Sequence, residues 1–209
     1  MRIAIIGLGY VGISLAKAFA KKFEVVGFDV NKDKINEYSN GIDRTGEVGE
    51  QVNKLGIMFT TEISDISTAD IVIVTVPTPT INGSIDDSYV KRATKMIASH
   101  IKKGSVVVYE STVYPFFTRE ECIPLLEKNS GWKCGVEFSV GYSPERVNPG
   151  DKVHTIEKIT KVISAFDTHT LNLLEKVYGE IIESVYPVDS LEIAEACKIL
   201  ENSQRDLNI

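Results

Sequence analysis

A short apolar run at the N-terminus leads directly into a glycine pattern, and this feature most constrains the fold. Residues 2–6 suit a buried parallel strand, and Gly7, Gly9 and Gly12 follow it with the spacing GxGxxG. Gly7 allows a tight turn, Gly9 lets the backbone approach a pyrophosphate, and Gly12 lets the next helix pack closely on the sheet. A helix beginning near Tyr10 would point its free N–H groups and positive dipole end at phosphates. The pattern therefore predicts a dinucleotide site after the first strand.

The elements around these glycines agree with that prediction. A helix is expected over 11–22 and a second strand over 24–28, and Asp29 ends that strand about 20 residues past the glycines. A carboxylate there can accept hydrogen bonds from ribose hydroxyls and would repel a 2′-phosphate, so Asp29 predicts NAD rather than NADP. Lys34, on the next expected helix over 31–40, either reaches the ribose edge or is an ordinary solvated lysine. The alternative for the whole feature is a tight strand–helix turn without a ligand.

The composition is that of an ordinary globular protein. Hydrophobic residues make up 43% and charged residues 25% of 209 positions, and the net charge of −6 argues against a nucleic-acid partner. The three cysteines, Cys122, Cys134 and Cys197, are few, odd in number and without metal-ligand spacing. No apolar run is long enough to cross a membrane. These features predict a cytoplasmic protein without a metal site.

Strands and helices alternate along the rest of the chain. Further strands are expected over 57–60, 71–76, 105–109, 138–141, 159–164 and 183–185, and further helices over 88–101, 118–128, 168–178 and 189–207. The polar segment 40–56 is expected to form a mobile loop or short helix over the cofactor. This alternation predicts an α/β fold of the Rossmann type, a doubly wound and mainly parallel sheet with helices on both faces.

Polar loops follow three successive strands of the expected sheet. They cover residues 76–80, 110–115 and 141–150. Each loop alone could be a plain turn, because Pro, Ser, Asn and Gly are turn residues. Ligands of such sheets lie beyond the carboxyl ends of the strands, where these loops would meet. Their coincidence predicts one composite site.

The terminal helix carries a polar face and an apolar one. Lys198, Asn202 and Arg205 fall at i, i+4 and i+7 and share a narrow face. The opposite stripe contains Ile193, Leu200 and Leu207. Spacing leaves two interpretations open, a solvated polar face or a catalytic lysine whose amide and guanidinium neighbours line a cleft.

Five ordered motifs together resemble the UDP-glucose/GDP-mannose dehydrogenase family. The motifs are Gly-Leu-Gly-Tyr-Val-Gly (7–12), Val-Pro-Thr-Pro (76–79), Glu-Ser-Thr-Val-Tyr-Pro (110–115), Tyr-Ser-Pro-Glu-Arg-Val-Asn-Pro-Gly-Asp (142–151) and Glu-Ala-Cys-Lys-Ile-Leu-Glu-Asn-Ser-Gln-Arg-Asp-Leu-Asn (195–208). The wording is most similar to UDP-N-acetylhexosamine 6-dehydrogenases of the Vi-polysaccharide type. The resemblance covers the whole chain.

The resemblance implies a four-electron oxidation of a UDP-sugar C6 alcohol to the acid, with two NAD reduced, in polysaccharide biosynthesis. It implies that Lys198 and Asn202 hold the C6 oxygen, that Glu145 acts in acid–base steps of thioester hydrolysis, and that Thr112 orients water and the nicotinamide end. The implied substrate contacts are Arg146, Val147, Lys198, Asn202 and Arg205, and the implied NAD contacts are Tyr10, Val11, Asp29, Pro77, Thr78 and Thr112. The full-length enzyme is expected to be a homodimer.

Two positions depart from the family pattern. Phe116 stands where the family has glycine, and because phenylalanine adopts a positive φ with difficulty, a changed loop path is expected. Ala165 replaces the glycine of a Ser-Gly pair, so a reshaped turn is expected there.

The resemblance also divides the chain. Residues 1–187 are expected to form an NAD-binding domain and 188–209 to begin an interdomain helix, with the family's cysteine nucleophile and sugar-binding domain lying beyond them. These 209 residues alone are then expected to bind NAD without turning over a UDP-sugar. Two alternatives stay open. One is a two-electron dehydrogenase of the 3-hydroxyacid or 6-phosphogluconate kind, which the 142–151 loop disfavours, and the other is a non-catalytic NAD-binding module.

Overall fold

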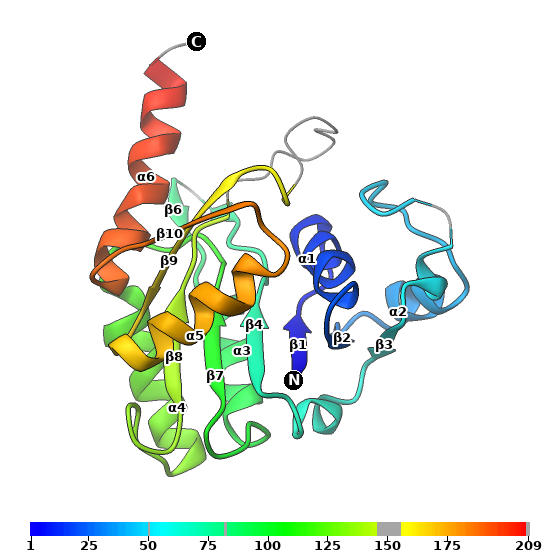
Figure 1. Ribbon diagram of the computed structural model, residues 1–209, viewed down its shortest axis with the longest axis horizontal. Helices are drawn as coiled ribbons and strands as arrows, with labels where there is room; N and C mark the ends of the chain where they lie inside the picture. The colour runs from blue at the N-terminus through cyan, green and yellow to red at the C-terminus, as the bar shows by residue number, and fades with distance from the viewer. Residues whose placement is uncertain (50, 82, 146–155, 208–209) are drawn as a thin grey trace.

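The computed structural model describes residues 1–49, 51–81, 83–145 and 156–207. Its main sheet has eight strands in the order β10-β9-β8-β7-β4-β1-β2-β3 (Figure 1). The strands are β1 (Arg2–Ile6), β2 (Glu24–Phe28), β3 (Ile57–Thr60), β4 (Ile71–Val74), β7 (Val106–Tyr109), β8 (Ser139–Tyr142), β9 (Thr160–Ala165) and β10 (Ser184–Pro187). Every neighbouring pair is parallel except β8 and β9. The predicted doubly wound, mainly parallel sheet is confirmed.

The sheet is buried on both faces by helices. Successive residues of a strand point to opposite faces, so Ile3 and Ile5 of β1 join one apolar layer while Ala4 and Ile6 join the other. Helices α1, α2 and α5 cover the first layer, and α3, α4 and α6 cover the second (Figure 1). The helices are α1 (Tyr10–Ala20), α2 (Lys32–Ser39), α3 (Ser88–Ala98), α4 (Ile123–Ser130), α5 (Thr168–Gly179) and α6 (Leu191–Leu207).

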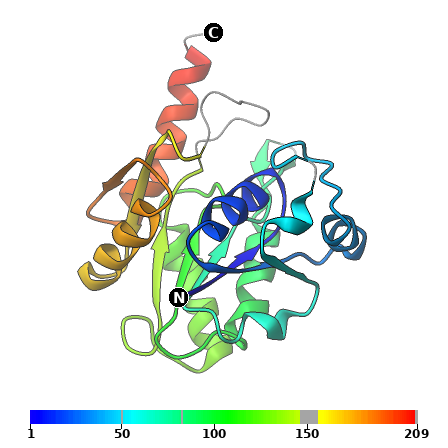
Figure 2. The same ribbon diagram turned by 45° about the vertical axis from the view of Figure 1, so that its right-hand side comes forward.

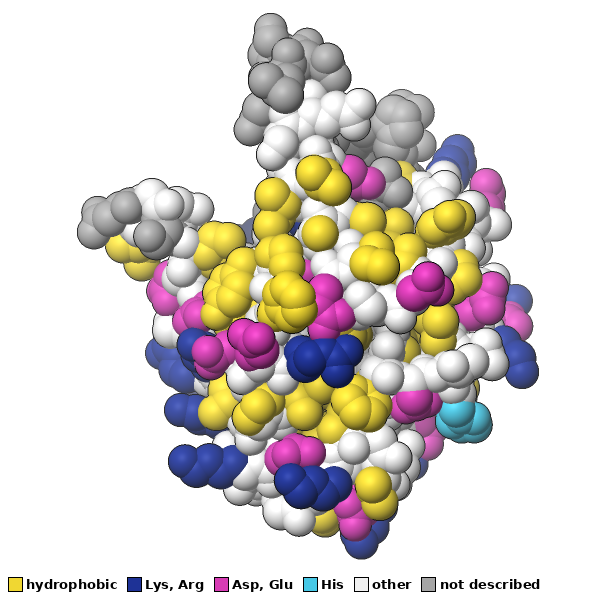
Figure 3. All heavy atoms as spheres, turned by 90° about the vertical axis from the view of Figure 1, so that its left-hand side faces the viewer, with side chains coloured by type: hydrophobic (Ala, Val, Ile, Leu, Met, Phe, Trp, Pro, Cys, Tyr) yellow, Lys and Arg dark blue, Asp and Glu magenta, His cyan; other side chains and the backbone are white. Residues whose placement is uncertain are grey.

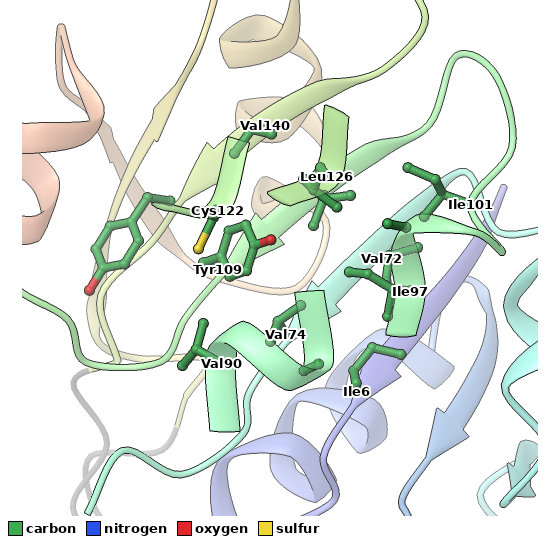
Figure 4. Close-up of a cluster of buried hydrophobic side chains, with 14 of the residues drawn as sticks. Ile6, Val72, Val74, Val90, Ile97, Ile101, Tyr109, Cys122, Leu126 and Val140 are labelled. Carbon is green, nitrogen blue, oxygen red and sulfur yellow. The ribbon is translucent and has the colours of Figure 1, made fainter. Parts of the chain in front are cut away.

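The second apolar layer shows why β-branched residues dominate the central strands. Val72 and Val74 of β4 face Val90 and Ile97 of α3, and all four side chains are fully buried (Figure 4). A parallel strand with helices on both sides has no solvent-facing positions, so its sequence is apolar throughout. This packing fixes the strand ends, and through them the loops that follow.

Helix α6 extends beyond the carboxyl edge of the sheet. It runs upward from the body of the domain, past the level at which the strands end (Figures 1 and 2). Ser190 precedes it, and the Ser190 hydroxyl accepts a hydrogen bond from the N–H of Ile193 at 3.3 Å. The first turns of α6 therefore rest on the sheet, and its later turns stand over the loops that follow the strands.

The structure corrects several local expectations. The helix expected over 118–128 begins as a π-helical turn, Thr118–Cys122, before α4. A small hairpin pairs β5 (Thr80–Ile81) with β6 (Ser84–Ile85), where only a loop was predicted. The described residues of the segment 40–56, which leave out residue 50, form a loop apart from a 3-10 turn at Val52–Lys54.

Two further expectations concerned Ala165 and α6. Ala165 does not lie in a reshaped turn, because it ends β9 in register with Gly141 and is buried. The predicted apolar stripe of α6 does not pack on the sheet either, since Ile193 is 46% and Leu200 68% exposed. Leu191, Ala194 and Glu195 form the buried face instead; the side chain of Leu207 and all of Ile209 lie outside the described residues. Among the described helices, none is long and apolar enough to traverse a bilayer.

Candidate functional site

The glycine turn joins β1 to α1 with almost no room for side chains. Gly7 has φ +93° and donates its N–H to the carbonyl of Phe28 at 2.8 Å. A Cβ on Gly12 would lie 2.0 Å from the carbonyl oxygen of Gly7. A Cβ on Gly9, in contrast, would meet no protein atom within 4 Å. The turn is therefore packed on its inner side and open on the side where Gly9 faces the pocket.

Asp29 fixes the turn from the end of β2. Its nearly buried carboxylate accepts hydrogen bonds from the N–H of Leu8 at 2.9 Å and of Asn31 at 2.9 Å. Lys34 pairs with the same carboxylate at 2.7 Å, and only 31% of the lysine side chain is exposed. Lys34 is thus an ion-pair partner of Asp29 at the pocket rather than a fully solvated lysine, and its contact with the ribose edge stays a prediction.

Two adjoining pockets lie along the carboxyl edge of the sheet. The smaller, of about 410 Å³, is lined by Asp29 and Lys34 together with Arg92 and Met96 of α3. The larger, of about 620 Å³, begins at the glycine turn and shares five lining residues with the smaller one, Gly7, Asp29, Lys34, Val76 and Pro77. Its lining includes Gly7, Gly9, Tyr10, Val11, Asp29, Lys34, Pro77, Thr78, Thr112, Glu145, Lys198 and Asn202. Twelve residues singled out from the sequence thus line one space, whereas Gly12 lies beneath the turn.

The inner end of the larger pocket is built from three separate elements. Thr112 follows β7, Glu145 follows β8, and Lys198 and Asn202 lie on α6. The Lys198 ammonium donates a hydrogen bond to the backbone carbonyl of Glu145, which ties α6 to the loop after β8. Of the polar face of α6, Lys198 and Asn202 therefore point into the pocket, as the cleft interpretation requires.

The loop after Thr112 has a positive φ at residue 116, although the phenylalanine there was expected to change the path of the loop. Phe116 has φ +76°, a left-handed conformation that is rare for a bulky residue. The fully buried carboxylate of Glu195 accepts hydrogen bonds from the N–H of Phe116 at 2.7 Å and of Thr118 at 2.8 Å. Burial raises the pKa of Glu195, whereas these hydrogen bonds act in the opposite direction and lower it. The α6 carboxylate thus holds the strained residue in place.

Sequence reasoning missed a buried ionic cluster at the wall of the pocket, where Glu110 is one of the lining residues. Lys161 of β9 forms an ion pair with Glu110, and the Tyr178 hydroxyl donates to the same carboxylate at 2.6 Å. The only sequence signal was a lysine directly before Val162 and Ile163 of a strand, where a buried lysine requires a partner of opposite charge. Glu195 was missed in the same way, as one acidic residue on an amphipathic helix.

The cysteines do not supply chemistry to this pocket. None of them is among its lining residues. Burial raises the pKa of the Cys122 thiol to about 12 and that of Cys134 to about 12, so both are protonated thiols at neutral pH. Among the described residues, no group of three or more His, Cys, Asp or Glu side chains could hold a metal ion.

Three of the predicted substrate contacts cannot be placed. Arg146 and Val147 lie outside the described residues. The backbone of Arg205 belongs to α6, but its side chain is also outside the description.

Comparison with known proteins agrees with this geometry. The sequence profile of the UDP-glucose/GDP-mannose dehydrogenase family, NAD binding domain, matches residues 1–182. Protein CapL of Staphylococcus aureus is 46% identical over 210 residues, covering 99% of this chain and 50% of CapL. The UDP-N-acetyl-D-glucosamine 6-dehydrogenase of Pseudomonas aeruginosa is 45% identical over 213 residues, covering 100% of this chain and 50% of that enzyme.

A solved structure shows the same architecture. The structure of a UDP-D-ManNAc dehydrogenase from Pyrococcus horikoshii superimposes with a TM-score of 0.93 at 31% identity, covering 100% of this chain and 51% of that one. The chain therefore spans about half the length of the relatives that it matches.

Proposed function

Because the chain belongs to the UDP-glucose/GDP-mannose dehydrogenase family as its NAD-binding domain, we propose that it serves a UDP-N-acetylhexosamine 6-dehydrogenase of polysaccharide biosynthesis. The substrate class rests on relatives such as the Pseudomonas aeruginosa enzyme, which is 45% identical to this chain. The single observation that carries the proposal is the shared pocket. It places the glycine turn and Asp29 at one end and Thr112, Glu145 and Lys198 at the other.

The outer part of the pocket fits a dinucleotide. Gly9 leaves open space beside the first turn of α1, and within the described residues no side chain caps that turn. Its free N–H groups are therefore available to a pyrophosphate. Asp29 would hold the adenosine ribose, and Pro77 and Thr78 would border the path towards Thr112. NAD, when bound, supplies the hydride acceptor.

The inner part of the pocket supplies positioning and proton transfer. The Lys198 ammonium and the Asn202 amide would hold the C6 oxygen of the sugar and stabilise negative charge that develops on it. Glu145, which lines this pocket, would accept and return protons during hydrolysis. Thr112 would orient the attacking water. Arg146, Val147 and Arg205 stay predicted contacts of the nucleotide-sugar.

Residues 1–187 would form the cofactor domain, and 188–209 would begin the helix that leads to a sugar-binding domain in the full-length protein. A homodimer and a cytoplasmic location complete the proposal. The exposed Ile193 and Leu200 of α6 support self-association, and hydrophobic side chains gather on the face of the molecule that carries this helix (Figure 3). Light scattering of the full-length protein, with Leu200→Glu for comparison, tests the dimer.

Turnover of the full-length gene product tests the function. With UDP-N-acetylglucosamine, two NADH should form for each uronic acid. Lys198→Met should abolish the rate while leaving NAD affinity unchanged, because Lys198 lies at the inner end of the pocket. A ratio of one NADH per sugar would instead support the two-electron alternative, and NAD binding without turnover of any UDP-sugar would support a non-catalytic module.

A further inference from the structure

Lys161 is a charged residue in a place that normally excludes charge. It lies in β9, and none of its side chain is exposed. Moving an ammonium out of water costs far more than a typical side-chain contact returns, unless anionic partners compensate it. The partners of Lys161 therefore indicate why it is there.

The first partner of Lys161 is Glu110, which accepts hydrogen bonds from two buried side chains. Its carboxylate binds the Lys161 ammonium through one oxygen and accepts the Tyr178 hydroxyl through the other at 2.6 Å. All three side chains are buried, and they come from β9, the end of β7 and α5. Burial raises the pKa of Glu110, and Lys161 opposes that rise. The ammonium thus sits in a fixed place between three elements of the fold.

The second partner reaches the pocket. Glu145 Oε2 lies 3.9 Å from the Lys161 Nζ, and the Glu145 side chain is 8% exposed where it lines the larger pocket. Other groups face Glu145 from neighbouring elements. Burial raises the pKa of Tyr10 in α1 and of Tyr178 in α5, and the charge of Glu145 adds to both rises. Lys198 of α6 donates a hydrogen bond to the backbone carbonyl of Glu145. Lys161 is therefore a buried cation next to the Glu145 carboxylate, which lines the pocket and would face a substrate.

We propose that Lys161 is a positioning residue for Glu145, and that its ammonium, anchored by Glu110 and Tyr178, keeps the Glu145 carboxylate ionised and turned towards the inner wall of the pocket. The proposal rests on the proposed function in so far as Glu145 works as a base. A base must hold no proton when the reaction begins, and a nearby ammonium favours the charged carboxylate. Glu110 competes for the same ammonium, so it weakens this effect on Glu145.

Because Glu110 competes with Glu145 for Lys161, replacing Lys161 and replacing Glu110 should change the ionisation of Glu145 in opposite directions. Lys161→Met removes the cation, and the buried Glu110 then takes up a proton, so ionised Glu145 loses its support. Glu110→Gln leaves the ammonium to Glu145 and strengthens that support. A purely structural ion pair predicts something different, because both variants break the same pair and should then disturb the site in the same direction.

The experiment is an infrared titration of the full-length protein labelled with ¹³C-glutamate. The band of protonated Glu145 is identified as the one that Glu145→Gln removes. At a fixed, mildly acidic pH, Lys161→Met should raise the ratio of protonated to ionised Glu145 at least about tenfold, since unit charges about 4 Å apart interact strongly in a partly screened site. Glu110→Gln should lower the ratio. Lys176→Met, an exposed lysine of α5, is the matched control and should leave it unchanged.

Kinetics give the second readout. The acid limb of the kcat profile should move to higher pH in Lys161→Met and to lower pH in Glu110→Gln, with KM for NAD unchanged. Lys161→Gln, which keeps a donor for Glu110, replaces Lys161→Met if the latter does not fold. Equal or parallel shifts of the infrared ratio in folded variants would overturn the role of Lys161. Absence of any turnover in the wild type would overturn the proposed function alone, because the infrared result does not depend on turnover.

Discussion

Glu195 offers the sharpest test of how α6 is attached to the domain. Its buried carboxylate accepts the N–H groups of Phe116 at 2.7 Å and Thr118 at 2.8 Å. Glu195→Gln keeps the size of the side chain but leaves only one acceptor oxygen, and its amide NH₂ then faces a donor. One buried N–H loses its partner, which costs about 1–3 kcal/mol. We therefore expect the free energy of unfolding to fall by about 2 kcal/mol.

The matched control lies one turn earlier on the same helix. Glu192 pairs with Arg119, whose side chain is 43% exposed, so Glu192→Gln should cost less than about 1 kcal/mol. Urea unfolding at neutral pH measures both variants. For a chain of this size, Glu195→Gln should also lower Tm by about 4–8 °C. If Glu195→Gln proves no less stable than Glu192→Gln, the carboxylate does not hold the loop and the reasoning is wrong.

Further predictions concern the glycine turn and a helix cap. Gly12→Ala should destabilise the fold by at least about 2 kcal/mol, because its Cβ would meet the Gly7 carbonyl at 2.0 Å. Gly9→Ala should keep wild-type stability but bind NAD at least about tenfold more weakly in calorimetry, since its methyl group would enter open pocket space; unchanged affinity would contradict the site. Asp167→Ala should lose about 1 kcal/mol in urea unfolding, as it removes the cap on the Thr170 N–H.

The same cap sets a pH dependence. Burial opposes the shift, but hydrogen bonds from Thr170 and Ser139 lower the pKa of Asp167 in the folded state. A carboxylate whose pKa is lower in the folded than in the unfolded protein stabilises the fold at pH values above its unfolded pKa, about 3.9 for Asp. This stabilisation is lost as the pH falls through the folded pKa. Asp167→Asn should therefore flatten the stability curve of the wild type below about pH 4. An unchanged acid limb would show that Asp167 is not the group responsible.

Local pattern was enough to predict the sheet and the outer pocket. The mainly parallel sheet with helices on both faces follows from alternating apolar runs and helices, and the glycine spacing predicts the turn because few other residues fit it. Asp29 was predictable for the same reason, since it ends the second strand beside that turn. The loops that carry Thr112 and Glu145 were predictable as a group because the strand ends of a parallel sheet converge. Helix spacing left Lys198 open, and only the family resemblance assigned it to the pocket.

Long-range polar contacts were not predictable from local pattern. The apolar stripe with Ile193 and Leu200 suggested the buried face of α6, yet the two hydrogen bonds of Glu195 turn another face inward. Glu195 also explains the positive φ of Phe116, because the carboxylate, 79 positions away in the sequence, accepts the Phe116 N–H and stabilises this conformation. Lys161 likewise depends on Glu110, 51 positions earlier. Periodicity carries no information about such pairs.

Titration of the chain with NAD and with NADP tests whether the pocket binds a dinucleotide with its adenosine ribose at Asp29. We predict one NAD site per chain and at least about tenfold tighter binding of NAD than of NADP, about 1.4 kcal/mol, because the Asp29 carboxylate would face the 2′-phosphate. Asp29→Asn should reduce this preference. Equal or tighter binding of NADP by the wild-type chain, measured by isothermal calorimetry, would contradict the assignment of Asp29 and with it the orientation of the cofactor in the pocket.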